Sequence, residues 1–246
     1  MRPSLFAASA VLAALSAAGC GPRVEERPPA PPVLPRTAEL REALGKAYRE
    51  SSREQLREFF ENWYRCVHPA EPDPSAKDAT LVFQAFYNPF ESEIMGEKWT
   101  MDAYRGVSYV IVQTTLEIVD EAASVRDTPV VVKGFRPRLD LPGVKVLYLT
   151  DRYRQALLDF LGPDASSEEI GKRLEFLKPL VKILRGHWTG WHLETHPEVE
   201  RMAFSQKGTR VAVHYRFGYG GGEAIFVKTG SRWVRTKEAG LTFWIE

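Results

Sequence analysis

Apolar residues recur at helical spacing at the start of the folded chain, between Thr37 and Val67. They are Leu40, Leu44, Tyr48, Leu56, Phe59, Phe60, Trp63 and Val67. The spacing breaks phase near Ser51, where Ser51-x-x-Glu54 and Ser52-x-x-Gln55 both fit the capping box that begins helices. The pattern therefore predicts either one interrupted helix or two consecutive helices.

A third helix is expected from about Ala76 to Phe86, and a block dense in β-branched and aromatic residues follows it. The segments VSYVIVQTTLEIV (107–119), TPVVVKGF (128–135) and VKVLYLT (144–150) are typical of strands. Because short connections join these segments, they predict an antiparallel meander.

Two more helices are expected after these strands. Thr150 could cap a helix that runs through Phe160, and Ser166-x-x-Glu169 is a capping box that opens another. The second helix carries an apolar stripe, and we expect Pro179 to kink it. The stripe consists of Ile170, Leu174, Leu177, Val181 and Leu184.

The C-terminal part is again rich in strand-forming residues, in segments that glycine-rich or polar turns separate. The segments are WHLETHPEVERMAF (191–204), TRVAVHYRF (209–217), GEAIFVK (222–228), SRWVR (231–235) and LTFWIE (241–246). Such short spacings require hairpins. The whole order predicts an α+β fold: N-terminal helices, an antiparallel meander, two further helices and a C-terminal antiparallel sheet of four to five strands. This order argues against a doubly wound parallel sheet.

The chain begins with a segment of a different kind, MRPSLFAASAVLAALSAAGC. One Arg precedes an uncharged run from Leu5 to Ala18 that ends in small residues, which is the pattern of a secretory signal peptide. The run is about fourteen residues long, whereas a membrane-spanning helix needs roughly twenty. Residues 1–19 are therefore expected to direct export and to take no part in the fold.

The end of this segment, Ala17-Ala18-Gly19-Cys20, resembles the lipobox of bacterial lipoproteins. In that family the Cys is lipidated and becomes the mature N-terminus, so the resemblance implies a covalent lipid on Cys20 and a membrane anchor. Gly21 rather than Asp after the Cys implies delivery to the outer membrane. Ala17 stands where lipoboxes usually carry Leu, which leaves ordinary cleavage after Ala18 as the alternative.

Residues 20–36 contain a proline-rich stretch with almost nothing that can pack. The stretch predicts an extended tether between the lipid and a folded body, or a tail without an anchor if Cys20 carries no lipid. The globular body is expected from 37 to 246, either as one domain or as two subdomains, 37–150 and 151–246.

The charge balance argues against some partners. The chain has 33 Lys and Arg residues against 32 Asp and Glu, and no basic patch stands out. This balance argues against nucleic acid as a partner and against docking through a polybasic surface. Cys66 would have no intramolecular partner beside a lipidated Cys20. It is interpreted as a packed residue, with an intermolecular disulfide as the alternative.

The common catalytic motifs are missing from this chain. It has no Gly-x-Ser-x-Gly, no phosphate-binding Gly-x4-Gly-Lys-Ser/Thr, no His-Glu-x-x-His and no dinucleotide motif before a helix. The glycine cluster from Gly218 to Gly222 lies between two strands, which favours a flexible hairpin over a phosphate site. A non-catalytic protein is therefore favoured over an enzyme, with no cofactor beyond the lipid.

One strand offers an alternative chemistry. His192 and Glu194 would share a face of it, and a hairpin with the next strand could bring His214 beside them. Two imidazoles and a carboxylate can bind zinc or iron(II). The alternative function is a metal-dependent enzyme that uses these three residues, with His187 or His196 as reserve ligands.

Ordinary strand alternation explains the same residues. A half-buried antiparallel strand has one polar face, on which His, Glu and Arg form common cross-strand pairs. The C-terminal aromatic residues, among them Trp188, Trp191, Tyr215 and Trp233, either fill the core or line a pocket for an apolar ligand or a sugar. The structural interpretation is preferred in both cases.

The part from Ser166 to Glu246, a helix that leads into a meander ending in Trp, resembles NTF2-like and cystatin-like α+β domains in its architecture. That family contains both enzymes and binding modules, so the resemblance implies no particular activity. The sequence thus predicts an envelope lipoprotein whose non-catalytic α+β body binds a partner protein or a small ligand.

Overall fold

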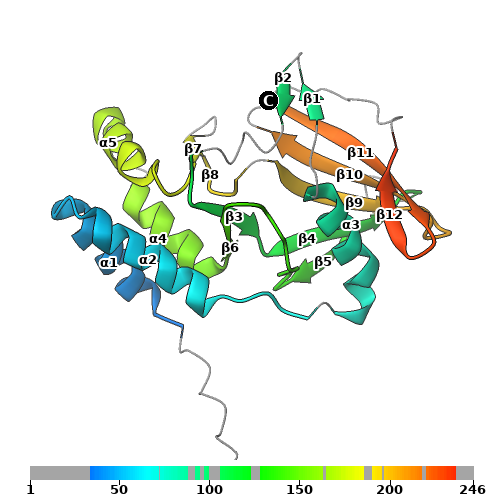
Figure 1. Ribbon diagram of the computed structural model, residues 1–246, viewed down its shortest axis with the longest axis horizontal. Helices are drawn as coiled ribbons and strands as arrows, with labels where there is room; N and C mark the ends of the chain where they lie inside the picture. The colour runs from blue at the N-terminus through cyan, green and yellow to red at the C-terminus, as the bar shows by residue number, and fades with distance from the viewer. Residues whose placement is uncertain are drawn as a thin grey trace, which may run out of the picture. The chain divides into compact units, whose positions relative to one another are not determined.

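The first two helices match the break in the sequence pattern. In the computed structural model (Figure 1), α1 (Thr37–Arg49) and α2 (Arg53–Cys66) are separate helices. Ser51 has a positive φ of 51°, which turns the chain between them. The Ser52 side chain then caps α2 by accepting a hydrogen bond of 3.2 Å from the Gln55 N–H. Two consecutive helices are therefore confirmed.

The structure describes residues 34–71, 73–87, 92–94, 97–99, 106–122, 128–162, 165–185, 190–195, 197–217 and 220–236. These residues belong to one compact unit that spans 32–246. Residues 20–33, which include Cys20 and most of its tether, lie outside the described residues, as do the expected last strand, His187 and His196. None of the described helices has the length and hydropathy to cross a membrane.

Two further helices, α4 (Asp151–Leu161) and α5 (Ser167–Leu177), complete the helical part. Ser166 caps α5 as predicted, accepting a hydrogen bond of 3.2 Å from the Glu169 N–H. The expected kink at Pro179 is wrong, because α5 ends two residues earlier. Pro179 has no N–H to donate to the Glu175 carbonyl, so the regular hydrogen bonds of the helix are interrupted after the one from the Lys178 N–H to the Leu174 carbonyl.

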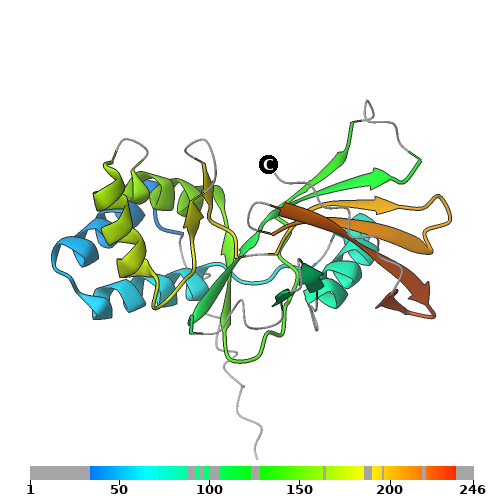
Figure 2. The same cartoon turned by 90° about the horizontal axis from the view of Figure 1, so that it is seen from above.

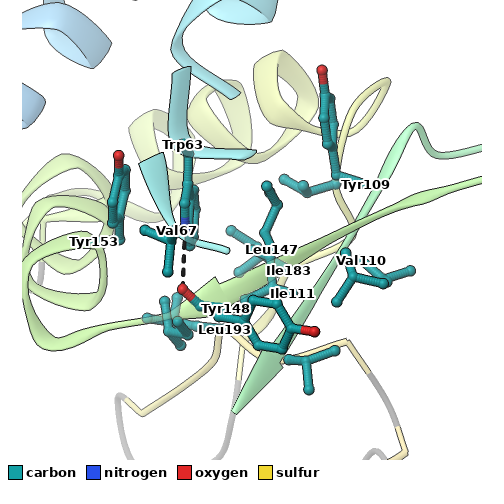
Figure 3. Close-up of a cluster of buried hydrophobic side chains, with 14 of the residues drawn as sticks. Trp63, Val67, Tyr109, Val110, Ile111, Leu147, Tyr148, Tyr153, Ile183 and Leu193 are labelled. Carbon is teal, nitrogen blue, oxygen red and sulfur yellow. Dashed lines mark hydrogen bonds between the residues drawn. The ribbon is translucent and has the colours of Figure 1, made fainter. Parts of the chain in front are cut away.

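A buried parallel strand pair lies against the helices. β3 (Tyr109–Gln113) pairs with β6 (Lys145–Leu149), and every residue of β3 is buried. Trp63 of α2 donates a hydrogen bond of 3.1 Å from its indole N–H to the Tyr148 carbonyl (Figure 3). Its ring stacks on Tyr153 of α4 at a centroid distance of 4.2 Å. These aromatic contacts join two helices to the strand pair.

The largest sheet has six strands in the order β12-β11-β10-β9-β4-β5. α3 (Lys77–Tyr87), which a short 3-10 turn (Pro74–Ala76) precedes, covers one face of this sheet (Figures 1 and 2). The Phe86 ring lies 5.3 Å from the Tyr215 ring across that contact. The six strands are β4 (Thr115–Asp120), β5 (Val130–Lys133), β9 (Glu198–Phe204), β10 (Arg210–Phe217), β11 (Gly220–Thr229) and β12 (Arg232–Arg235).

Two small antiparallel sheets complete the described strands. One pairs β1 (Ser92–Ile94) with β2 (Glu97–Trp99), and the other pairs β7 (Leu184–Arg185) with β8 (Trp191–His192). β11 begins at Gly220, so most of the predicted glycine hairpin is strand.

The predicted α+β class is confirmed, with β9 to β12 as its C-terminal antiparallel sheet. Two pairings differ from the expected meander, because β6 pairs with β3 in parallel and β4 pairs with β9 in parallel. The cause is a bend at Thr114, whose hydroxyl donates a hydrogen bond of 2.8 Å to the Leu149 carbonyl. The segment 107–119 is therefore two strands that belong to different sheets.

Candidate functional site

The strand expected from 191 to 204 is two strands, and this division changes the neighbours of His214. β8 is a short strand that pairs with β7, and β9 begins only at Glu198. His214 on β10 therefore pairs with a later part of β9, at Arg201, rather than with the segment that contains Glu194. The predicted hairpin pairing is wrong in its register.

The three residues predicted as metal ligands lie in different surroundings. His192 and Glu194 are buried, with 8% and 5% of their surface exposed. The Glu194 carboxylate accepts a hydrogen bond from the Arg154 guanidinium of α4. His214 lies on the six-stranded sheet. Within the described ranges, no three His, Cys, Asp or Glu side chains gather as a ligand group.

The outer face of the six-stranded sheet, meaning the face opposite α3, carries a row of charged residues. Glu117 on β4 pairs with Arg201 on β9, Arg201 with His214 on β10, and His214 with Glu223 on β11. The Arg201 guanidinium donates two hydrogen bonds, of 2.9 and 3.2 Å, to Glu117 Oε2. His214 Nε2 lies 3.5 Å from Glu223 Oε2. Carboxylates thus stand at both ends of the row and basic side chains in the middle, an order that favours cross-strand attraction.

A β-bulge in β9 adds another carboxylate beside this row. The register between β9 and β10 shifts between His214 and Tyr215, which leaves Glu200 as the extra residue. Arg216 donates a hydrogen bond of 3.0 Å from its Nε to Glu200 Oε1, and its Nη2 lies 2.8 Å from the same oxygen. The bulge therefore creates a second arginine–carboxylate pair next to the first.

A hollow of about 400 Å³ lies on this face, and the described residues that line it are Glu117, Glu200, Arg201 and His214. We call it the outer-face hollow. The next row of the sheet is apolar, with Ala203 and Ala212 packed against Ile225. Because all four of the described lining side chains are ionisable, the outer-face hollow suits a polar ligand.

Two acidic residues lie where β9 begins: Glu198 is its first residue, and Glu194 is close enough for its charge to act on Glu198. Glu198 is directly opposite Arg216 in the ladder. Burial raises the pKa of Glu198 to about 7, and the negative charge of Glu194 adds to the rise, while the guanidinium groups of Arg216 and Arg154 oppose it. This carboxyl group can therefore both donate and accept a proton near neutral pH.

The segment between β8 and β9 is held in place by its neighbours. The Thr195 N–H donates a hydrogen bond of 2.8 Å to the Ile111 carbonyl, and the Thr195 hydroxyl accepts one of 3.0 Å from the Ile111 N–H. The Tyr87 hydroxyl donates to the Pro197 carbonyl at 2.5 Å. Glu194 and Glu198 thus flank a segment whose backbone β3 and α3 fix.

Several members of this charged network were not predicted from the sequence. Arg154 is one of several charged residues on a surface helix, and no periodic pattern sets it apart. Glu200 would be an ordinary member of an alternating strand without the bulge. The order of charges along LETHPEVE (193–200) does not reveal which carboxylate contacts which arginine.

No family model, curated protein or solved structure matches this chain. The resemblance to NTF2-like and cystatin-like domains therefore stays a prediction.

Proposed function

We propose that this protein is a lipid-anchored envelope protein whose outer-face hollow binds a small zwitterion of the amino-acid or short-peptide type. The observation that carries the proposal is the lining of the outer-face hollow, which combines two carboxylates with a guanidinium and an imidazole. A ligand with one ammonium and one carboxylate group complements both kinds of charge.

The existing ion pairs of the hollow can exchange for ligand contacts. Arg201 and Glu117 are 47% and 38% exposed, so water already screens their attraction. Exposed pairs of this kind contribute only about 0–1 kcal/mol to stability. A ligand carboxylate on Arg201 and a ligand ammonium on Glu117 would therefore replace the pair at little cost.

The size of the hollow limits the ligand. Its volume of about 400 Å³ lies near the lower end of ligand sites, which span roughly 300–1,000 Å³. An amino acid or a dipeptide fits such a space. The proposal needs no chemical step and therefore no catalytic residue.

The N-terminal segment supports the part of the proposal that concerns the lipid anchor. An export signal that ends in a lipobox-like Cys20, followed by a proline-rich tether, is what a lipid-anchored binding protein requires. The lipid would hold the body near the membrane surface in the envelope.

Calorimetric titration of the full chain with the dipeptide Ala-Ala tests the binding. We expect saturable binding that is about tenfold weaker for N-acetyl-Ala-Ala and for Ala-Ala amide, because each lacks one charge. Arg201→Gln should weaken binding, whereas Arg232→Gln, on an exposed residue of β12, should not. Absence of saturable binding at millimolar dipeptide would contradict the ligand assignment.

Metabolic labelling with radioactive palmitate tests the anchor separately. The wild-type chain and Cys66→Ser should carry the label, and Cys20→Ser should not. An unlabelled wild-type chain would refute the anchor and leave the binding experiment unaffected.

A further inference from the structure

Strand β5 (Val130–Lys133) is an edge of the six-stranded sheet and bears exposed valines. Among the described strands it pairs only with β4. Val130 is 66% exposed and Val131 is 44% exposed. Successive side chains point to opposite faces of a strand, so both faces of this edge present apolar surface.

The backbone of β5 is also open to pairing. In an edge strand, every second residue directs its N–H and C=O away from the sheet, where another strand can pair with them. Natural sheets protect such edges with charges and prolines. Here Pro129 and Lys133 stand at the two ends of the strand, and the valines between them have no such protection.

We propose that two copies of this chain associate through β5, antiparallel and edge to edge, so that their sheets become one continuous sheet. A two-fold axis perpendicular to the sheet relates the strands and makes the contact self-complementary. Such an axis keeps each face of the sheet on its own side. Only residues that share a face can therefore stand opposite each other.

One register fits the side chains of β5 best. With Val131 opposite Val131 of the second copy, Val130 stands opposite Val132 and every valine meets a valine. Pro129, which has no N–H to donate, then stands opposite Lys133 at the end of the ladder. A register centred on Val132 would instead place the Lys133 ammonium opposite Val131.

The neighbouring charges permit this register. Val131 pairs with Glu117 on the outer face, so the two Glu117 side chains would flank the central valines. Each of these carboxylates is already bound by an Arg201 guanidinium at 2.9 Å. Like charges therefore do not oppose the contact. The two outer-face hollows would lie on the same side of the joined sheet.

Light scattering of the full chain in detergent, with the micelle mass subtracted, tests the proposal. We expect two chains per particle at micromolar concentration for the wild type, and one for Val131→Lys, which places like charges at the centre of the contact. Val234→Lys makes the same change at an exposed position of the opposite edge strand and should stay dimeric. A wild type with one chain per particle, an open polymer, or equal dissociation by both variants would overturn the proposal.

Disulfide trapping decides the register even if Val131→Lys fails to fold. Residues directly opposite in an antiparallel pair have Cα atoms about 4.5–5.5 Å apart, within the range that a disulfide spans. Val131→Cys should therefore form a covalent dimer on a non-reducing gel, and Val234→Cys should not. A dimeric Val131→Cys protein that forms no disulfide under oxidation would show that β5 is not the contact.

Discussion

The side chain of Gln113 pairs with the backbone of Val199 as a neighbouring strand would. Its Oε1 accepts a hydrogen bond of 3.0 Å from the Val199 N–H, and its Nε2 donates one of 2.5 Å to the Val199 carbonyl. The same Nε2 donates to the Thr115 carbonyl at 2.9 Å. This single amide thus joins the end of β3, the start of β4 and the start of β9. Glu198 and Glu200, two carboxylates of the candidate site, are the residues on either side of Val199.

Replacing this amide should destabilise the fold. Gln113→Ala leaves the buried N–H and C=O of Val199 without partners, and we expect it to lower the free energy of unfolding by about 2–3 kcal/mol. Gln84→Ala is the matched control, because Gln84 also donates to a backbone carbonyl, that of Arg138, but at an exposed position. Urea unfolding measures both changes, and equal losses would contradict the special role of Gln113.

The structure separates what local sequence can predict from what it cannot. The starts of α2 and α5 were predictable because Ser52 and Ser166 cap helices within three residues of themselves. The strand pairings were not, because Gln113 and Thr114 bind backbone groups far away in the chain, and these contacts divide one apolar run between two sheets. Long-range hydrogen bonds of single polar residues leave no periodic pattern.

Glu198 should make stability depend on pH. Its pKa is raised from 4.5 to about 7, so the folded protein binds this proton more tightly than the unfolded chain does. The resulting stabilisation is complete below about pH 4.5 and is lost as the pH rises through 7. It should amount to on the order of 3 kcal/mol between about pH 4.5 and pH 8.

Glu198→Gln replaces the carboxyl group with an amide that does not titrate, and it therefore tests this expectation. Relative to the wild type, the variant should become more stable as the pH is raised from about 5 to about 8, as urea unfolding at each pH would show. Glu58→Gln changes an exposed glutamate of α2 and serves as the control. The same pH dependence in wild type and Glu198→Gln would show that this carboxyl group is not the cause.

Two buried tyrosines should respond in opposite ways to loss of their hydroxyl groups. The Tyr153 hydroxyl finds no hydrogen-bond partner among the described residues, whereas the Tyr148 hydroxyl donates to the Pro137 carbonyl. Tyr153→Phe should therefore leave stability unchanged or raise it by up to about 2 kcal/mol, and Tyr148→Phe should lower it by about 1 kcal/mol. Thermal unfolding of both variants checks the pair. A clear loss in Tyr153→Phe would indicate a bound water on that hydroxyl.

The candidate site could be predicted only in part. Alternation placed His214 on the polar face of its strand, and the structure confirms its place beside charged neighbours on that face. The separation of His214 from Glu194 could not be foreseen, because it depends on the break between β8 and β9. That break follows from the contact of Thr195 with Ile111, eighty-four positions earlier in the chain.

Gly222 should be essential for the packing of Tyr215, although it has an ordinary backbone conformation. The two residues are cross-strand neighbours, and a Cβ on Gly222 would lie 2.7 Å from Tyr215 Oη and 2.8 Å from its Cζ. The ring has no room to move, because it is fully buried against Phe86. Gly222→Ala should therefore lower the free energy of unfolding by about 1–3 kcal/mol.

Gly171→Ala is the control for this substitution, because nothing lies within 4 Å of a Cβ at that helical position. It should raise the stability by about 0.5–1 kcal/mol through the better helix propensity of alanine. Tyr215→Val removes the ring, and in that background Gly222→Ala should cost much less than in the wild type. Chemical denaturation of the four proteins of this cycle measures the coupling. If Gly222→Ala cost the same with and without the ring, the glycine would be required for a reason other than contact with Tyr215.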